Sequence, residues 1–358
     1  IDAVAVIANE NRYHPVCDFL NALHWDGTER IRFCLHRFLG SDTDDYTYEA
    51  LKLFLLGAIS RAFKPGCKFE VMLCLVGGQG AGKSSFFRLL AVNDDWFSDD
   101  LKKLDDENVY RKMQGHWIIE MSEMIATANA KSIEEIKSFL SRQKETYKIP
   151  YETHPADRKR QCVFGGSSNT LDFLPLDRTG NRRFVPVMVY PERAEVHILA
   201  DEQASREYIN QMWAEAMEIY RSGNFRLRFS PAMNDYLKAH QKDFMPEDTK
   251  AGQILDYLER YSGSIVCSKQ LYKEALGHDY DEPKQWELRE INDIMNNAVT
   301  GWRAFSNPRY FPEPYRRQKG WERIRNDNEP DNSMDGFQEI PTEEMEQLGL
   351  PEEWLKQK

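Results

Sequence analysis

A lysine and a serine end a glycine-rich run whose spacing suits phosphate binding. Residues 77–84 read Gly-Gly-Gln-Gly-Ala-Gly-Lys-Ser, which fits the pattern G-x-x-x-x-G-K-[ST] at every position. Glycines let successive backbone N–H groups turn toward phosphate oxygens. In this pattern Lys83 contacts the β- and γ-phosphates, and Ser84 binds Mg²⁺. The sequence therefore predicts ATP and Mg²⁺ as cofactors, bound by residues Gly77, Gly78, Gln79, Gly80, Ala81, Gly82, Lys83, Ser84 and Ser85.

Two acidic residues follow an apolar run farther along the chain. Residues 117–120 read Trp-Ile-Ile-Glu, and Glu123 comes three residues after Glu120. A P-loop site needs carboxylates near the end of a second strand, to bind Mg²⁺ and to polarise the attacking water. We assign Glu120 to the metal and Glu123 to the water, and these roles could be exchanged. The alternative for each is an exposed acid at the end of a strand.

An asparagine and two arginines complete the candidate catalytic set. Asn169 follows a third apolar run, residues 162–165, and its amide could hold the attacking water against the γ-phosphate. Arg182 and Arg183 precede the next apolar run. An arginine at the rim of a domain can reach the nucleotide of a neighbouring subunit, and either residue suits this role. The alternatives are an ordinary loop asparagine and surface ion pairs.

Short apolar runs that alternate with helical patterns position these side chains. Such alternation predicts an α/β fold, with the glycine-rich run as part of its core. The expected strands are residues 71–76, 117–120, 162–165 and 184–189. The expected helices are residues 48–63, 85–91 and 205–221. The glycine-rich run then lies between a strand and a helix, where the dipole of the helix favours phosphate binding.

The pattern changes after residue 231. Three short helical patterns are followed by two strand-like pieces that flank a basic loop, which is typical of a winged helix. These pieces are residues 253–261, 269–276, 285–298, 302–305 and 321–324. We therefore predict a helical N-terminal region at 1–66, an ATPase domain at 67–230, a linker at 231–252, a winged-helix domain at 253–324 and an acidic tail at 325–358.

The composition limits the class of protein. The net charge of −11 argues against a surface that coats nucleic acid, although the acidic tail leaves room for local basic patches. Six cysteines without a C-x-x-C pair favour a reducing, intracellular setting. No apolar stretch is long enough to span a membrane, so no membrane partner is expected. The chain begins with Ile1 rather than methionine, and we expect it to be a fragment of a longer protein, which could have a further N-terminal domain.

The order of these motifs resembles superfamily 3 helicases. A closer resemblance is to the virulence-associated protein E family, over residues 10–225, in the segments 11–16, 25–27, 137–142, 147–151 and 179–184. It implies a hexameric AAA+ ATPase that unwinds DNA in the replication of phages or mobile elements. It also implies a primase domain or partner and a location in the bacterial or phage-infected cytoplasm. Many superfamily 3 members have two adjacent acids, whereas Glu120 and Glu123 are three apart.

In superfamily 3 a hairpin between the second and third strands follows single-stranded DNA through the ring. Here residues 147–151 would form its first strand, 152–157 its tip, and the return would begin at residue 158. Cations on this hairpin and on the wing can bind phosphates without reading sequence. Our candidates are Lys148, His154, Arg158, Lys159, Arg160, Arg316, Arg317 and Lys319. The alternatives are a solvated charged turn and, for the winged helix, a packing or subunit contact.

A different function class also fits the P-loop. The chain could be a switch or loader that uses ATP to control assembly of a protein partner and unwinds nothing. A small-molecule kinase has less support, because no acceptor-site motif is evident and the C-terminal module is of a DNA-binding type. Strand displacement on forked DNA separates a helicase from a switch.

Overall fold

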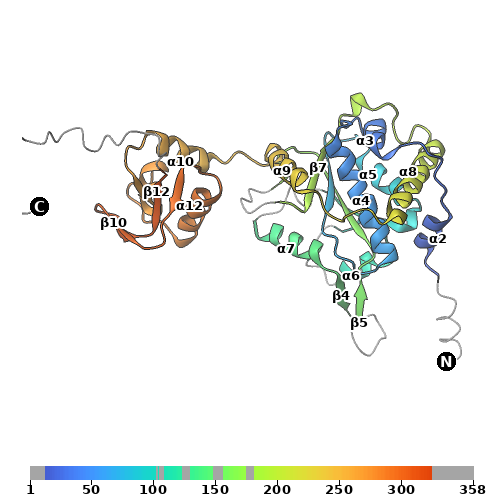
Figure 1. The fold of residues 1–358 in the computed structure, drawn as a ribbon, viewed down its shortest axis with the longest axis horizontal. Helices are drawn as coiled ribbons and strands as arrows, with labels where there is room; N and C mark the ends of the chain where they lie inside the picture. The colour runs from blue at the N-terminus through green and yellow to red at the C-terminus, as the bar shows by residue number, and fades with distance from the viewer. Residues whose placement is uncertain are drawn as a thin grey trace, which may run out of the picture. The chain divides into compact units, whose positions relative to one another are not determined.

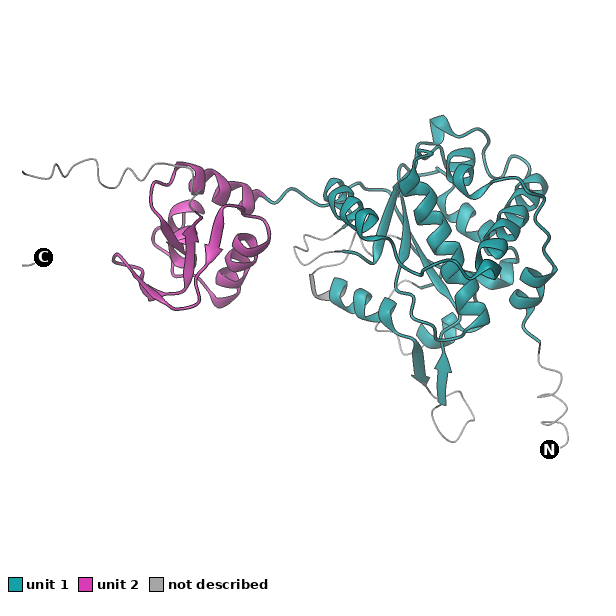
Figure 2. Ribbon diagram, in the orientation of Figure 1, with its two compact units in different colours: residues 1–248 teal, residues 249–358 magenta. Residues whose placement is uncertain are grey.

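The computed structural model describes residues 13–101, 104, 109–122, 130–147, 156–174 and 181–324. The chain divides into two compact units, residues 1–248 and 249–358 (Figure 2). Each unit has its own hydrophobic core. The first unit holds every P-loop and strand-end residue that the sequence singled out, so the site is built within it.

A five-stranded sheet lies at the centre of the first unit (Figure 1). In spatial order its strands are β2 (Phe97–Ser98), β3 (Ile118–Ser122), β6 (Val163–Ser168), β1 (Met72–Val76) and β7 (Phe184–Met188). All neighbours pair in parallel. The strands therefore all end at one edge, the carboxyl edge, and begin at the other, the amino edge. Four of the five agree with the expected strands to within three residues, and β2 was not foreseen.

Helices cover both faces of this sheet. Leu73 and Leu75 of β1 join one buried cluster, while Met72, Cys74 and Val76 join another. This follows from the period of two, which sends successive side chains to opposite faces. The helices are α2 (Pro15–Ala22), α3 (Ile31–Leu39), α4 (Asp45–Phe63), α5 (Lys83–Leu90), α6 (Val109–Met113), α7 (Ala130–Ser141), α8 (Glu202–Ser222) and α9 (Pro231–His240), with the short η1 (Asp94–Trp96), η2 (Pro191–Arg193) and η3 (Gln241–Phe244).

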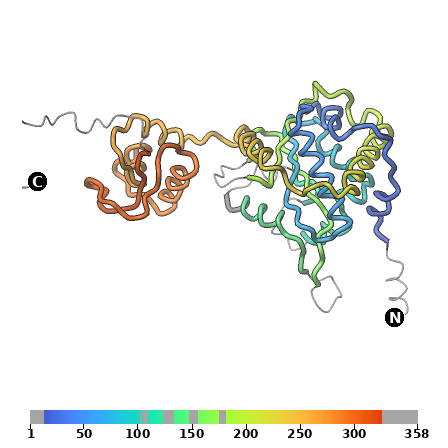
Figure 3. Tube along the Cα trace, viewed as in Figure 1, coloured from blue at the N-terminus to red at the C-terminus, as the bar shows by residue number. Residues whose placement is uncertain are grey.

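The first cluster joins segments far apart in the sequence. Helices α2, α3 and α4 pack with α8, which comes after the last strand of the sheet in the sequence (Figure 3). Trp213 of α8 is fully buried there and stacks at 4.5 Å from Trp117, the residue before β3. The second cluster gathers α6, α7 and η3 on the opposite face, with Phe139 and Phe244 buried in it. Among the described residues, none of the helices is long and apolar enough to cross a membrane.

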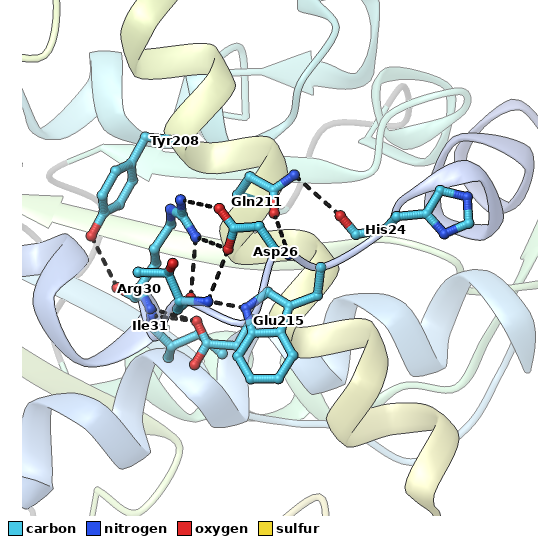
Figure 4. A network of polar contacts seen from close by, with 9 residues as sticks. His24, Asp26, Arg30, Ile31, Tyr208, Gln211 and Glu215 are labelled. Atoms are coloured by element: carbon cyan, nitrogen blue, oxygen red, sulfur yellow. Dashed lines mark hydrogen bonds and ion pairs between the residues drawn. The ribbon is translucent and has the colours of Figure 1, made fainter.

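The turn before α3 is bound to α8 by a polar network (Figure 4). The Arg30 guanidinium donates to both oxygens of Asp26, at 2.7 and 2.6 Å. Gln211 accepts from the Asp26 backbone N–H at 3.0 Å. Glu215 accepts from the backbone N–H groups of Arg30 and Ile31, at 2.6 and 2.9 Å, and so caps α3. The bonds from Arg30 lower the pKa of Asp26, whereas burial raises the pKa of Glu215.

The second unit packs helices against a small antiparallel sheet. Its helices are α10 (Thr249–Arg260), α11 (Ser268–Gln270), η4 (Leu271–Ala275) and α12 (Gln285–Asn297). The sheet has the order β8 (Ile265–Cys267), β12 (Gly320–Arg323), β9 (Trp302–Ala304), and β10 (Arg309–Phe311) pairs with β11 (Arg316–Gln318). Ile254, Leu271, Ile294 and Trp321 form its core. The helical patterns and the β9 and β12 strands lie where the sequence placed them, whereas β8, β10 and β11 were not foreseen.

The segment 231–252, which we expected to be a linker, differs from that expectation. It contains α9, η3 and the first residues of α10. Leu237 of α9 and Phe244 of η3 are each 1% exposed in the cores of the first unit. The polar residues around them concealed these two apolar anchors in the sequence.

Candidate functional site

The glycine-rich run forms the turn between β1 and α5. Gly80 and Gly82 both have φ +80°, a left-handed conformation that favours glycine. A Cβ on Gly77 would lie 2.5 Å from the Val189 carbonyl oxygen, so no side chain fits there. Helix α5 begins at Lys83, two residues earlier than expected, and its first N–H groups therefore face the turn. The local backbone is thus a tight glycine turn that leads into the N-terminus of a helix.

A cleft of about 380 Å³ opens at this turn. It is lined by Gln79, Gly80, Ala81, Gly82, Lys83, Ser84, Ser85, Ser122, Ser167, Asn169, His197 and Leu199. The P-loop thus meets residues from three other segments, all at the carboxyl edge of the sheet. Brought together there, they form a polar concave site of the kind that binds ligands in open α/β sheets.

Lys83 and Asn169 meet in this cleft. The Lys83 ammonium donates to the carbonyl oxygens of Gly77 and Gly78 at 2.6 and 2.7 Å. It also donates to Asn169 Oδ1 at 3.0 Å. Asn169 comes directly after β6, which pairs with β1, so the sheet brings its amide to the loop. Lys83 and Asn169, which were chosen from separate motifs, are therefore in direct contact in the cleft.

Glu120 lies beside Ser84 and is fully buried. Its Oε1 accepts from Ser84 Oγ at 2.8 Å and from Ser167 Oγ at 2.5 Å. Its Oε2 is buried and has no hydrogen-bond partner in the described part of the chain. This carboxylate oxygen and the neighbouring Ser84 hydroxyl are both oxygen ligands of the kind that Mg²⁺ prefers. Glu123 lies outside the described residues.

Arg182 and Arg183, the candidates for reaching a neighbouring subunit's nucleotide, lie at the amino edge. Arg182 Nη2 pairs with Glu70 Oε1 at 2.9 Å, and Arg183 Nε lies 3.4 Å from Glu70 Oε2. Arg183 also donates to Ser141 Oγ at 2.9 Å. Burial raises the pKa of Glu70, but the Ser141 hydroxyl and both guanidiniums outweigh it, so the pKa is lowered. Because β7 and β1 are parallel, both arginines lie at the edge opposite their own P-loop.

A hairpin precedes β6 and leaves the sheet at the same edge. Its strands are β4 (Lys144–Tyr147) and β5 (Ala156–Lys159), so the first strand begins three residues earlier than expected. Asp157 accepts from Thr146 Oγ1 at 2.6 Å and pairs with Lys144, which ties the two strands together. Arg158 is half-buried and Lys159 is exposed. The candidates Lys148 and His154 lie outside the described residues.

Arg160 lies inside the protein, in contrast to our expectation of a surface cation. Its side chain is 1% exposed and pairs with buried Glu145. It also donates to the Phe139 carbonyl at 2.6 Å and lies over the Phe139 and Phe164 rings, 4.6 and 5.1 Å from their centroids. The physical reason is position: Arg160 follows the last paired residue of β5, where the chain turns back into the core.

Arg158 and Lys159 also border a second cavity, of about 590 Å³, at the root of the hairpin. Trp96, Tyr110 and Trp117 supply part of its apolar lining. In the second unit, the three wing candidates Arg316, Arg317 and Lys319 are exposed on or next to β11. Arg316 pairs with Glu313 at 3.3 Å. The cations chosen from the sequence thus lie in two separate units.

Four lining residues of the cleft at the glycine-rich turn were missed by the sequence reasoning. Ser122 ends β3 and Ser167 is the second-to-last residue of β6; they face each other in register, with their hydroxyl oxygens 3.5 Å apart. His197 and Leu199 lie between β7 and α8, in a stretch without any motif. For the serines, a polar residue at the end of an apolar run was a usable signal. His197 and Leu199 had no such signal in the sequence, because only the fold brings their loop back to the P-loop.

Comparison with known proteins finds a matching family model and similar solved structures. A family model described as the virulence-associated protein E-like domain matches residues 20–246. No curated protein matches the chain. An apo structure of the NrS-1 C-terminal region is 12% identical with a TM-score of 0.47, covering 85% of this chain and 78% of that one. A second structure of that region is 13% identical with a TM-score of 0.49, covering 86% and 78%.

Proposed function

Because this chain belongs to the virulence-associated protein E-like family, we propose that it is an ATP-dependent DNA helicase of the superfamily 3 type. It would act in the replication of a phage or mobile genetic element. The observation that carries the proposal is the convergence of Lys83, Ser84, Glu120 and Asn169 at one edge of the sheet. This arrangement supports binding and hydrolysis of a nucleoside triphosphate within an AAA+ P-loop core.

Each residue of the cleft has a distinct part in this mechanism. Lys83 binds the β- and γ-phosphates, and Asn169, 3.0 Å from its ammonium, orients the attacking water. Ser84 and Glu120 would hold Mg²⁺, which neutralises charge on the phosphates when bound. The unpartnered Oε2 of Glu120 is available to that cation or to water in its shell. Glu123 remains our candidate for activating the water.

The arginines at the amino edge act on a neighbouring subunit in a hexameric ring. Arg182 is 68% exposed and is bound by Glu70, whereas Arg183 is 21% exposed and contacts both Glu70 and Ser141. Greater exposure favours Arg182 as the residue that reaches the neighbour's γ-phosphate. Arg183 is then a positioning residue that fixes Glu70. This assignment chooses between two arginines that the sequence left equal.

Contact with DNA is assigned to two surfaces. Arg158 and Lys159, with Lys148 and His154, would follow the phosphates of a single strand through the ring. In the second unit, which we interpret as a winged helix, the exposed cations beside β11 would hold duplex or forked DNA. Arg160 is left out of the hairpin set because it is buried. A primase domain or partner and a cytoplasmic location complete the proposal.

A strand-displacement assay on forked DNA tests the function. We expect unwinding that requires Mg²⁺ and ATP and is lost in Lys83→Ala. Shared sites are tested by mixing Arg182→Ala with Lys83→Ala subunits, because one of the two mixed interfaces combines an intact P-loop with an intact arginine. Recovery of ATP hydrolysis in the mixture is expected. No recovery at any ratio contradicts the trans arginine, and ATP hydrolysis without unwinding contradicts the helicase.

The alternative is an ATP-driven switch or loader for a protein partner. It is favoured by the described strands of the hairpin, where Asp157 neutralises Lys144 and Glu145 neutralises Arg160, so that neither of these two cations is left for DNA. The same assay decides between the two. A switch would hydrolyse ATP and change its assembly state, measured by mass with an ATP analogue bound, without separating strands.

A further inference from the structure

Two side chains border the nucleotide cleft on the side away from the metal-binding residues. His197 and Leu199 lie in the loop that follows β7. In the sheet, β7 adjoins β1 on the side opposite β6 and β3. Glu120 of β3 and Asn169 after β6 mark the γ-phosphate end of the cleft. A triphosphate bound by the P-loop therefore has its nucleoside end directed toward the β7 side.

The loop that carries these residues is held in place. The Tyr190 backbone N–H donates to the Leu39 carbonyl at 2.9 Å, and that of Val196 donates to the Arg37 carbonyl at 3.2 Å. Both acceptors are in α3. Ile198 is fully buried in the first hydrophobic cluster. Its two neighbours in sequence are exposed, so the buried isoleucine fixes the loop while they line the cleft.

The chemistry of the pair suits a nucleoside. His197 Nδ1 accepts from the Leu199 backbone N–H at 3.2 Å, so the neutral ring carries its proton on Nε2. Nε2 lies 4.0 Å from the place that a Cβ would take on Gly82, at the start of α5. Leu199 is 42% exposed, so part of its apolar surface faces the solvent at the cleft. A donor beside an apolar surface matches a ring with apolar faces and acceptor atoms.

We propose that His197 and Leu199 form the nucleoside-binding wall of the cleft. Leu199 packs against a face of the base, and His197 Nε2–H donates to an acceptor atom of the nucleoside. The P-loop supplies most of the contacts to phosphate, and this wall tells a nucleotide from a bare polyphosphate. The inference rests on the proposed function, since it requires a triphosphate in the P-loop.

Calorimetric titration of the full chain with two ligands tests the wall. One ligand is ATP with Mg²⁺, and the other is inorganic tripolyphosphate with Mg²⁺, which has the phosphates and no nucleoside. Leu199→Ala should raise the Kd for ATP about tenfold, from the lost apolar burial. His197→Ala should raise it about fivefold, from the lost hydrogen bond. The Kd for tripolyphosphate should change by less than about twofold in either variant.

Matched controls come from the same unit. His24→Ala and Phe33→Ala remove exposed side chains that do not line the cleft, and should leave both affinities unchanged. Two results overturn the inference: an unchanged Kd for ATP in both cleft variants, or an equal loss for both ligands. Failure of the unaltered chain to bind either ligand overturns the proposed function instead, so the two failures are distinct.

Discussion

The two edges of the parallel sheet treat buried charge in opposite ways. At the carboxyl edge, fully buried Glu120 receives hydrogen bonds on one oxygen, while its other oxygen has no partner in the described part of the chain. At the amino edge, buried Glu145 pairs directly with buried Arg160. There, too, Glu70 binds the arginines that precede β7.

This difference separates a binding site from a framework. A buried carboxylate without a counter-charge lowers stability unless a cation binds to it. At the carboxyl edge this loss of stability remains in the protein without ligand, which suits a site whose cation arrives with a ligand. The amino edge cancels its charges within the protein, and its ion pair fixes the root of the β4–β5 hairpin to the core. One sheet therefore has the candidate site at one end and charges paired within the protein at the other.

The largest expected effect is at the carboxyl edge. Lys83→Ala removes the ammonium that lies against Gly77, Gly78 and Asn169. We expect ATP hydrolysis to fall about a thousandfold, because a preorganised positive charge on the phosphates is lost. Phosphate release at saturating ATP measures the fall, and the circular dichroism melt should stay close to that of the unaltered chain. Hydrolysis at more than about a tenth of the original rate contradicts the P-loop assignment.

At the amino edge the effect should fall on stability instead. Arg160→Met takes from buried Glu145 its closer cation and leaves it Arg142 at 3.6 Å, and we expect the free energy of unfolding to drop by about 3 kcal/mol. Urea unfolding measures it. The double variant Arg160→Met with Glu145→Gln should recover part of the loss, because the remaining group is uncharged. A single variant as stable as the parent contradicts the role of this pair as a framework.

A smaller effect of opposite sign is expected at Glu120. Glu120→Gln keeps an acceptor for Ser84 and Ser167 but removes a buried charge. The free energy of unfolding without ligand should therefore rise by about 1 kcal/mol. Magnesium with ATP should then raise the melting temperature of the parent and raise that of the variant much less. Equal stabilisation of both by magnesium with ATP contradicts a metal-binding role for Glu120.

The smallest effect concerns Asp26, which belongs to neither edge. The bond from Arg30 lowers its pKa in the folded state, so as pH falls the unfolded chain takes up the proton first. Its stabilising contribution is thus complete above the unfolded pKa of about 3.9 and is lost below it. Urea unfolding between about pH 6 and pH 3 should show a steeper loss in the parent than in Asp26→Asn. Parallel curves contradict the assignment.

Strands and helices with strong periodicity were predictable, and irregular ones were not. Residues 71–76 became β1 almost unchanged, because a buried parallel strand reads as a continuous apolar run. Strand β2 has only two residues, too short to leave a pattern. The segment 231–252 reads as polar, although Leu237 and Phe244 anchor it in the core. Two apolar side chains among many polar ones give no period to detect.

The candidate site shows the same division. Lys83, Glu120 and Asn169 could be chosen from motifs because their chemistry demands fixed residue types at strand ends. The burial of Arg160 could not be foreseen, since Arg-Lys-Arg looks uniformly basic until a strand pairing decides which side chain turns inward. His197 was invisible for a related reason. Its place at the cleft depends on a loop far from the P-loop in sequence.

The sequence alone was enough to find the glycine-rich turn, the polar residues at the ends of the following strands and the alternation of strands and helices. These are local properties, fixed by residue type and by spacing along the chain. Only the tertiary structure decided which side chains meet, which charges are buried and cancelled, and which arginine is exposed. The reason is the strand order, which no local pattern encodes. It places β6 between β3, which carries Glu120, and β1, which leads into the P-loop, and it brings the residues after β7 back to the cleft.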